Sequence, residues 1–146
     1  MLEARAAQAP EIDTDTLSTG MVLPLLRHLP SLGPMTTVIL HGNCVFEFKG
    51  AFPQGIESSG FYNLDGPTPG FHGHLRIDAM TRVRFQDRPH RGRASYAFVF
   101  ENQKEEVLFK VFLGRDDEGA IYEEQLQFFH RLRQGRRLPL PVELTP

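Results

Sequence analysis

The middle of the chain alternates between apolar and polar residues with a period of two. Over residues 36–50, one set of alternate positions is mainly apolar and the other is mainly polar. The apolar set is Val38, Leu40, Cys44, Phe46 and Phe48, and the polar set is Thr37, His41, Asn43, Glu47 and Lys49. Because successive side chains of a strand point to opposite faces, this pattern predicts a strand with one buried face and places His41 on its polar face.

Further short segments rich in β-branched and aromatic residues follow, separated by turn residues. They are residues 58–66, 71–77 and 81–86, and residues 94–114, which contain two such runs joined through residues 101–105. The last segment predicts a β-hairpin. Together the segments predict five or six strands that are mostly antiparallel, because their connections are short.

Two segments predict helices. Residues 21–30 are mainly apolar, with Pro24 suited to a first helical turn and Pro30 to a stop. Near the C-terminus, apolar residues recur at helical spacing between acidic and basic residues, and Gly135 stands at the expected end. These apolar residues are Tyr122, Leu126, Phe129 and Leu132. The chain therefore predicts an α+β fold, in which a short N-terminal helix and a C-terminal helix accompany a large antiparallel sheet.

Length and composition indicate one domain over residues 1–146, with residues 1–16 as a flexible tail. The chain has 146 residues, of which 40% are hydrophobic, and a formal net charge of −2. This charge does not favour nucleic acid or anionic lipid as a partner. The single cysteine, Cys44, excludes an internal disulfide, and its apolar neighbours predict a buried, reduced thiol. No stretch approaches the roughly 18 apolar residues of a membrane span, so we expect a cytoplasmic protein.

Residues 66–78 hold two histidines, His72 and His74, one residue apart after a loop rich in glycine and proline. In a strand such a pair points to one side, as in several β-rich metal sites. The spacing is similar to the start of the first cupin motif, with Asp78 in place of its glutamate, but the second motif is absent and no third histidine ligand follows. One alternative is thus a metal-dependent enzyme that uses His72, His74 and Asp78; another is that these histidines only satisfy loop backbone or face solvent.

No other catalytic signature is present. The chain has no nucleophile elbow, phosphate loop or dinucleotide fingerprint, and its basic clusters at 88–93 and 131–137 are not interleaved with aromatic residues as in nucleic-acid sites. What remains is a β-rich domain with polar-faced histidines, 12 phenylalanines and a few cations. Such a chain is suited to hold a flat, apolar, dianionic ligand rather than to catalyse a reaction.

Several segments resemble the haem-utilisation carriers of the HutX/ChuX type. They are "TTVILHGNCVFEFKG", "GFYNLDG", "PGFHGHL", "RPHRGR", "SYAFVF" and "LFKVFLGRD" followed by "EQLQFFHRLR", in the family's order from about residue 35 to 133. The resemblance implies an α+β fold and a homodimer similar to the two-repeat haem proteins of the HemS/ChuS type. It also implies a carrier that binds haem in the bacterial cytoplasm and passes it to a haem-degrading enzyme.

The resemblance also implies site residues. The family histidine in "GH" falls on His74, which we expect to bind the haem iron, with His72 and His41 as secondary candidates. The second family histidine falls on Leu40, so that His41 corresponds to it only if a bulge shifts the strand. Where some members have a ligand tyrosine in "GYFNL", this chain has Phe61, with Tyr62 beside it on the opposite face, and Tyr62 is a further candidate for contact with haem.

We expect the haem propionates to be bound by cations on the strands, namely Arg76, Arg84 and Lys110. A further alternative is a dimeric interaction module that has lost haem binding.

Overall fold

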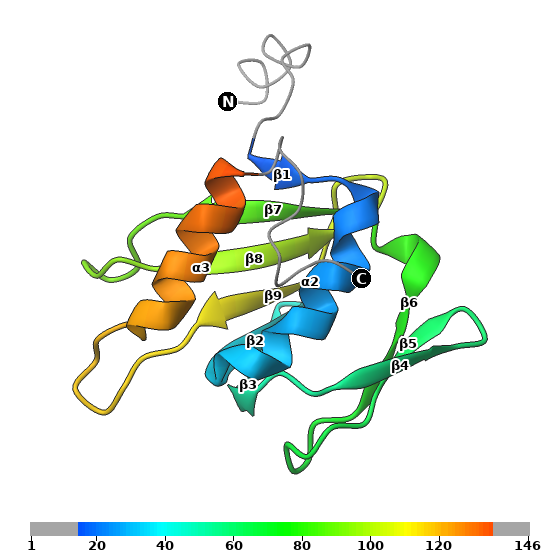
Figure 1. Ribbon diagram of the computed structural model, residues 1–146, viewed down its shortest axis with the longest axis horizontal. Helices are drawn as coiled ribbons and strands as arrows, with labels where there is room; N and C mark the ends of the chain where they lie inside the picture. Colours follow the sequence, from blue (N-terminus) through cyan, green and yellow to red (C-terminus); the bar gives the residue numbers. More distant parts are fainter. Residues whose placement is uncertain (1–14, 136–146) are drawn as a thin grey trace, which may run out of the picture.

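The computed structural model describes residues 15–135, and its main feature is a six-stranded antiparallel sheet (Figure 1). The strand order is β1-β7-β8-β9-β2-β3. The strands are β1 (Thr16–Leu17), β2 (Pro34–His41), β3 (Cys44–Ala51), β7 (Arg82–Asp87), β8 (Tyr96–Glu101) and β9 (Val107–Leu113). Strands β8 and β9 form the predicted hairpin, which confirms that reading of the alternating pattern.

A second, three-stranded antiparallel sheet lies at one end of the molecule, away from α3 (Figure 1). Its order is β4-β5-β6. The strands are β4 (Gly55–Ser58), β5 (Phe61–Leu64) and β6 (Gly73–Arg76). The sequence analysis predicted the second and third of these strands but not their separation from the large sheet.

Two α-helices, α2 (Val22–His28) and α3 (Glu123–Gln134), lie on the same face of the large sheet (Figure 1). The 3-10 turns η1 (Thr19–Met21) and η2 (Leu29–Leu32) flank α2, and η3 (Ile77–Ala79) follows β6. Both predicted helices are therefore confirmed, and so is the α+β fold. None of the described helices is long and apolar enough to cross a membrane.

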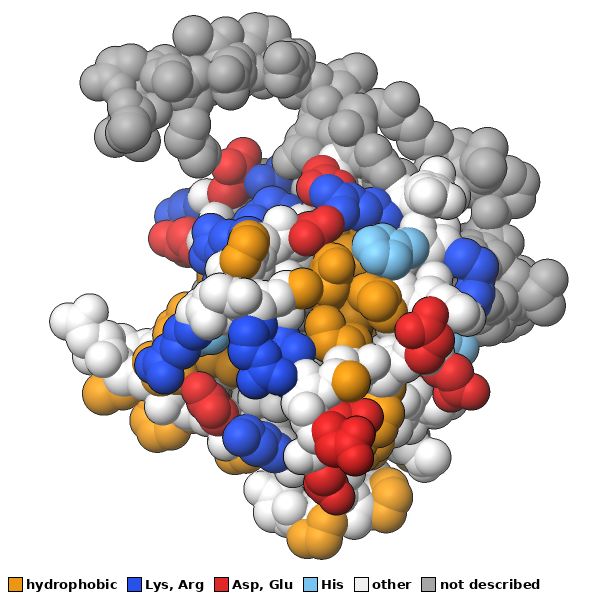
Figure 2. All heavy atoms as spheres, turned by 90° about the vertical axis from the view of Figure 1, so that its left-hand side faces the viewer, with side chains coloured by type: hydrophobic (Ala, Val, Ile, Leu, Met, Phe, Trp, Pro, Cys, Tyr) orange, Lys and Arg blue, Asp and Glu red, His pale blue; other side chains and the backbone are white. Residues whose placement is uncertain are grey.

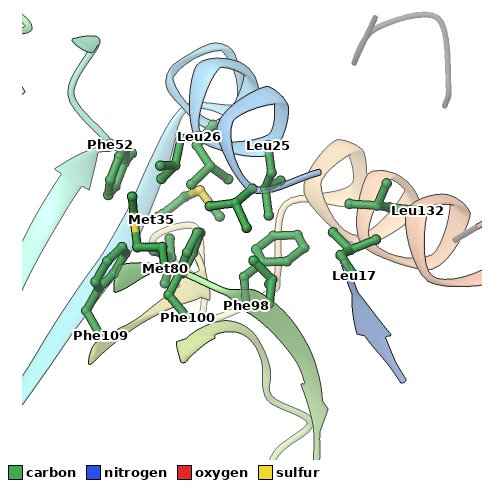
Figure 3. Packing of buried hydrophobic residues seen from close by; sticks show 14 of the residues in the cluster. Leu17, Leu25, Leu26, Met35, Phe52, Met80, Phe98, Phe100, Phe109 and Leu132 are labelled. Atoms are coloured by element: carbon green, nitrogen blue, oxygen red, sulfur yellow. The ribbon is translucent and has the colours of Figure 1, made fainter. Parts of the chain in front are cut away.

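The hydrophobic core lies between these helices and the sheet (Figure 3). Leu25 and Leu26 of α2 and Phe129 of α3 are fully buried against Phe98 and Phe100 of β8. Phe98 and Phe100 both point toward the helices, because side chains two residues apart in a strand face the same side of the sheet. Burying side chains of this size contributes about 1.5–3 kcal/mol each, which makes this layer the main source of stability.

The expectation of one continuous strand across residues 36–50 is wrong, because a tight turn divides the segment into β2 and β3. Gly42 and Asn43 both have positive φ angles, of 57° and 67°, as a two-residue hairpin turn of type I′ requires. His41 pairs with Cys44 across the turn. Because directly paired residues share a face, the turn exchanges the faces of odd and even positions, and Val38 lies beside Glu47 while Ile39 lies beside Phe46. The expected apolar face is therefore divided between the two sides of the sheet, and His41 lies on the side of Ile39 rather than on a polar face.

Two further expectations, a buried Cys44 and a tail over residues 1–16, also differ from the structure. Cys44 begins β3 and is exposed, so the prediction of a buried thiol is wrong. The expected tail ends before Asp15, because Thr16 pairs with Arg84 and the Asp15 carboxylate accepts hydrogen bonds from Arg133 at 2.7 and 2.9 Å. Residues 1–14 of that expected tail lie outside the described residues.

The buried face of α3 differs from the predicted apolar stripe. Its buried residues are Gln125, Phe128, Phe129 and Leu132. Gln125 is fully buried, and its side chain binds three backbone groups from two segments of the chain. Its Nε2 donates to the carbonyls of Leu32 and Pro34 at 2.9 and 2.8 Å, and its Oε1 accepts from the N–H of Gly114 at 2.7 Å. A polar side chain inside the core is thus compatible with burial because every polar atom is paired.

Candidate functional site

The outer face of the small sheet carries the histidine that the resemblance singled out. In the register of this sheet, Ile56, Asn63 and His74 lie side by side on three adjacent strands. Phe61 and Arg76 form the next pair on the same face, because they lie two residues away along β5 and β6. This face is open to solvent, since His74 and Arg76 are exposed and Ile56 keeps 71% of its surface accessible.

The His74 ring has two close neighbours on this face. Its Nδ1 lies 2.7 Å from Oδ1 of Asn63, which is a short hydrogen bond. The ring of Phe61 stands edge-on to it, with 6.4 Å between the ring centroids. The imidazole is therefore oriented by the protein on one side while it remains exposed on the other.

A cation completes the outer face. The guanidinium of Arg76 lies over the Phe61 ring, 5.1 Å from its centroid, in a cation–π arrangement. Its Nη1 is 3.9 Å from the carboxylate of Asp78, which is a loose, exposed ion pair. Within two strands the face therefore offers an imidazole, apolar surface and a positive charge.

Tyr62 lies on the opposite face of the small sheet, where it is 1% exposed within the core. Burial raises the pKa of its hydroxyl above the ordinary value of 10.0, and the nearby Arg27 partly opposes this change. The ring packs against Gly55, where an added Cβ would lie 2.5 Å from a ring carbon. The structure therefore does not bring Tyr62 together with His74, and its proposed contact with haem is without geometric support.

The other candidate histidines lie apart from the strand that positions His74. His72 is exposed and precedes β6, so the pleat of the strand does not fix its direction. His41 is the exposed last residue of β2. Among residues 15–135, no group of three or more His, Cys, Asp or Glu side chains is arranged to hold a metal ion.

A concave surface of about 660 Å³ lies on the outer face of the large sheet, between β2, β9 and the β7–β8 loop. Its lining combines apolar side chains with basic ones, among them Lys49, Arg88, Arg91, Arg93, Lys110 and Arg115. Figure 2 views the side of the molecule that carries α3 and the loops beside it, where Lys and Arg side chains again lie close to exposed apolar ones. In the lining of the groove these basic side chains outnumber the acidic ones, of which Glu47 is an example.

Lys110 and Arg84 both lie on this outer face, in register with Val99 between them. The Lys110 ammonium donates to Oε1 of Gln86 at 3.0 Å. Burial lowers the pKa of Lys110 from its usual 10.5, and repulsion from Arg88 and Arg84 lowers it by a smaller amount. An anion that binds near this ammonium would relieve that repulsion.

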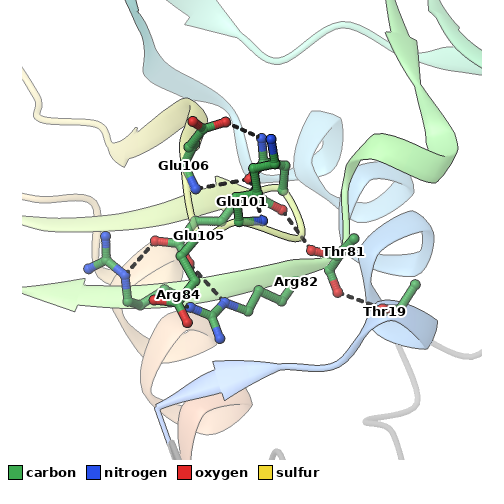
Figure 4. Close-up of polar contacts among 9 residues, drawn as sticks. Thr19, Thr81, Arg82, Arg84, Glu101, Glu105 and Glu106 are labelled. Atoms are coloured by element: carbon green, nitrogen blue, oxygen red, sulfur yellow. Dashed lines mark hydrogen bonds and ion pairs between the residues drawn. The ribbon is translucent and has the colours of Figure 1, made fainter. Parts of the chain in front are cut away.

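The Arg84 guanidinium is already engaged within the protein (Figure 4). Its Nε donates to one oxygen of the buried Glu101 carboxylate at 2.8 Å, and Nε of Arg82 donates to the other at 2.9 Å. Of the three cations predicted to bind propionates, only Arg76 shares a face with His74, because Arg84 and Lys110 lie on the large sheet.

Asn63 and Ile56 were not predicted as site residues. Their place beside His74 depends on how β5 pairs with its neighbours, and residues 65–72 between β5 and β6 carry no signal that fixes this register. The 71% exposure of Ile56 becomes visible only in the structure, so it could not have marked this face in the sequence.

Comparisons with known proteins agree with the fold described above. Residues 16–132 match the sequence model of the family described as haem utilisation ChuX/HutX. The intracellular haem transport protein HutX of Vibrio cholerae serotype O1 is 36% identical over 113 residues, which are 77% of this chain and 58% of that protein. The chain thus spans less than two thirds of that relative's length.

Solved structures show the same fold. The structure of the haem-binding protein ChuX superposes with a TM-score of 0.76 at 25% identity, covering 84% of this chain and 77% of the other. Holo-PhuS, a haem-binding protein from Pseudomonas aeruginosa, gives 0.66 at 14% identity, covering 79% of this chain and 33% of the other. The second likeness concerns the fold alone.

Proposed function

The chain belongs to the haem utilisation ChuX/HutX family, and we propose that it is a haem-binding carrier in which His74 binds the iron. The observation that carries this proposal is the geometry at His74. Its imidazole is exposed on a strand, its Nδ1 is held by Asn63, and apolar and cationic side chains flank it. When bound, haem would supply an iron atom with a free axial position for an imidazole nitrogen.

The residues around His74 fit the chemistry of haem. Ile56 and Phe61 offer apolar surface for a macrocycle, and burying the exposed Ile56 side chain against a ligand is favourable. Arg76 can form charge-assisted hydrogen bonds with a propionate. Its competing partner, Asp78, is 3.9 Å away and exposed, so little energy is lost when Arg76 turns to a ligand.

An open face suits a carrier better than an enzyme. A ligand held by one axial residue on a solvent-exposed sheet can be released without unfolding of a closed pocket. We propose that the protein acts in the cytoplasm and passes haem to a haem-degrading enzyme. The relative named an intracellular haem transport protein supports this role.

We also propose that the protein forms a homodimer. The outer face of the large sheet supports this, because Leu40 and Val45, paired across the β2–β3 hairpin, expose 48% and 56% of their surfaces. Changing both residues to lysine should convert a dimer to a monomer in light scattering coupled to size-exclusion chromatography. The change Val107→Lys, at another exposed apolar position on a strand of that sheet, is the control and should not alter the mass. A wild-type protein that is monomeric at all concentrations would contradict the homodimer.

A haemin titration tests the carrier function. Adding haemin to the purified protein should shift the Soret band saturably, and His74→Ala should remove or greatly weaken the shift while the melting temperature changes little. His72→Ala is the matched control, because His72 is exposed two residues away but lies outside the strand. No shift in the wild type would refute haem binding. It would leave two alternatives, the metal-dependent enzyme and the interaction module, which metal analysis of the purified protein would separate.

A further inference from the structure

We propose that Asn63 is a positioning residue that fixes the tautomer of His74, so that Nδ1 carries the proton and Nε2 presents its lone pair to a ligand. Neutral histidine has one ring proton, and the hydrogen bond made by one nitrogen decides which nitrogen is left to bind a metal. The part of this inference that concerns iron rests on the proposed haem-binding function. The tautomer itself is a property of the protein without any ligand.

The orientation of the Asn63 amide is determined by its surroundings. Its nitrogen, Nδ2, lies 3.0 Å from the carbonyl oxygen of Ile56, and 3.4 Å from those of Ser58 and Phe61. Carbonyl oxygens can only accept hydrogen bonds, so the end of the amide that faces them must be the NH2 group. With the amide reversed, its oxygen would face three other oxygens and find no donor.

The same orientation directs Oδ1 of Asn63 at the histidine. Oδ1 is only an acceptor, and it lies 2.7 Å from Nδ1 of His74, so Nδ1 must donate the proton. In the neutral ring Nε2 is then unprotonated. This is the form of imidazole that coordinates a metal ion, and no proton has to be moved when the ligand binds.

The backbone holds this pair in place. Asn63 and His74 are direct cross-strand partners on β5 and β6, and Asn63 is half-buried while His74 is exposed. The edge of the Phe61 ring limits rotation of the imidazole on one side. The arrangement therefore orients the ring and selects its tautomer before any ligand arrives, which reduces the entropy lost on binding.

The first test needs no haem. Ring nitrogen chemical shifts of His74 in the 15N-labelled protein, recorded about two pH units above the ordinary pKa of histidine, report which nitrogen is protonated. We expect a protonated Nδ1 in the wild type and in Asn63→Gln, which keeps both the acceptor oxygen and the NH2 group. We expect a loss of this preference in Asn63→Leu, which has a similar size and no acceptor. A protonated Nε2 in the wild type would overturn the inference without recourse to any variant.

The second test measures haemin affinity in the same three proteins. Partners that orient metal-binding histidines typically change metal affinity by about 10–100-fold, so Asn63→Leu should weaken haemin binding by that factor and Asn63→Gln should weaken it less. Thermal unfolding checks that each variant is folded. Equal affinity in wild type and Asn63→Leu would overturn the positioning role.

The two proposals fail in different ways. If the wild type shows the Nδ1–H tautomer but does not bind haemin, the carrier function is wrong and the tautomer assignment stands. If haemin binding depends on His74 but the free protein has a protonated Nε2, the carrier function stands and the role of Asn63 is wrong.

Discussion

Replacing Gln125 with methionine should destabilise the fold by about 3 kcal/mol, because the buried amide of Gln125 fixes α3 to the sheet. Methionine has a similar length and no hydrogen-bonding group that can replace the amide. The change leaves the buried N–H of Gly114 without its acceptor, at a cost of about 1–3 kcal/mol. The carbonyls of Leu32 and Pro34 lose their donor but are partly accessible to water, so they add about 1 kcal/mol together.

Local rearrangement cannot easily restore this contact. Gly114 packs directly on the Pro34 carbonyl, and an added Cβ at Gly114 would overlap that oxygen. The β9–α3 connection is therefore too close to the start of β2 for another side chain to take the place of the amide. Water would need a space that the packed backbone does not offer.

Urea denaturation followed by circular dichroism measures the effect, together with a melting curve. A loss of 3 kcal/mol corresponds to a decrease in Tm of about 6–12 °C for a chain of this size. Gln127→Met is the matched control, because Gln127 lies on the exposed side of α3 and its side chain donates only to Glu123, at 3.2 Å. If the two variants differ by less than about 0.5 kcal/mol, the hydrogen bonds of Gln125 do not stabilise the fold as argued.

Three more changes test other parts of the structure. Gly55→Ala should cost about 1–3 kcal/mol because its Cβ would meet the Tyr62 ring, whereas Gly73→Ala, with 3.8 Å to its nearest neighbour, should differ from wild type by less than about 0.5 kcal/mol in the same melting assay. Glu101→Gln should lower the free energy of unfolding in urea by about 1–3 kcal/mol, since it leaves two partly buried arginines around a neutral amide, and an unchanged value would contradict this role. Because the pKa of Lys110 is lowered in the folded protein, the unfolded state binds more protons at this lysine just below pH 10.5, so Lys110 should contribute stability to the wild type as the pH rises through that range, relative to Lys110→Met. Lys110→Met should lack this gain when urea denaturation is compared at about pH 8 and about pH 10, and parallel curves would refute the lowered pKa.

The sequence predicted those elements whose pattern is local. The helix at α3 was identified from helical spacing, from Glu123 and Glu124 in its first turn, and from Gly135 at its end. The β8–β9 hairpin was identified from two β-rich runs that flank a polar connection. Each of these signals lies within a few turns or strands of the chain, where periodicity is informative.

The site residues depend on contacts that are distant in sequence. Asn63 meets His74 only because β5 and β6 pair in one register across an intervening loop, and a shift by one residue would turn the Asn63 side chain to the other face. Gln125 was not among the residues predicted to be buried, because two of the backbone groups that it satisfies lie about 90 residues away. Neither arrangement can be read from local periodicity.

The small sheet also explains why the order of Phe61 and Tyr62 matters for the proposed function. Tyr62 and Leu64 face the core and anchor β5, so Phe61 and Asn63 face outward beside His74. A phenol at the inward position has a raised pKa and lies away from any ligand on the outer face, whereas the outward position holds a phenylalanine that cannot coordinate iron. The alternation of β5 therefore leaves an imidazole, and no phenol, as the ligand that this face offers. A single neutral imidazole on an exposed strand is consistent with the release of ligand that the proposed carrier function requires.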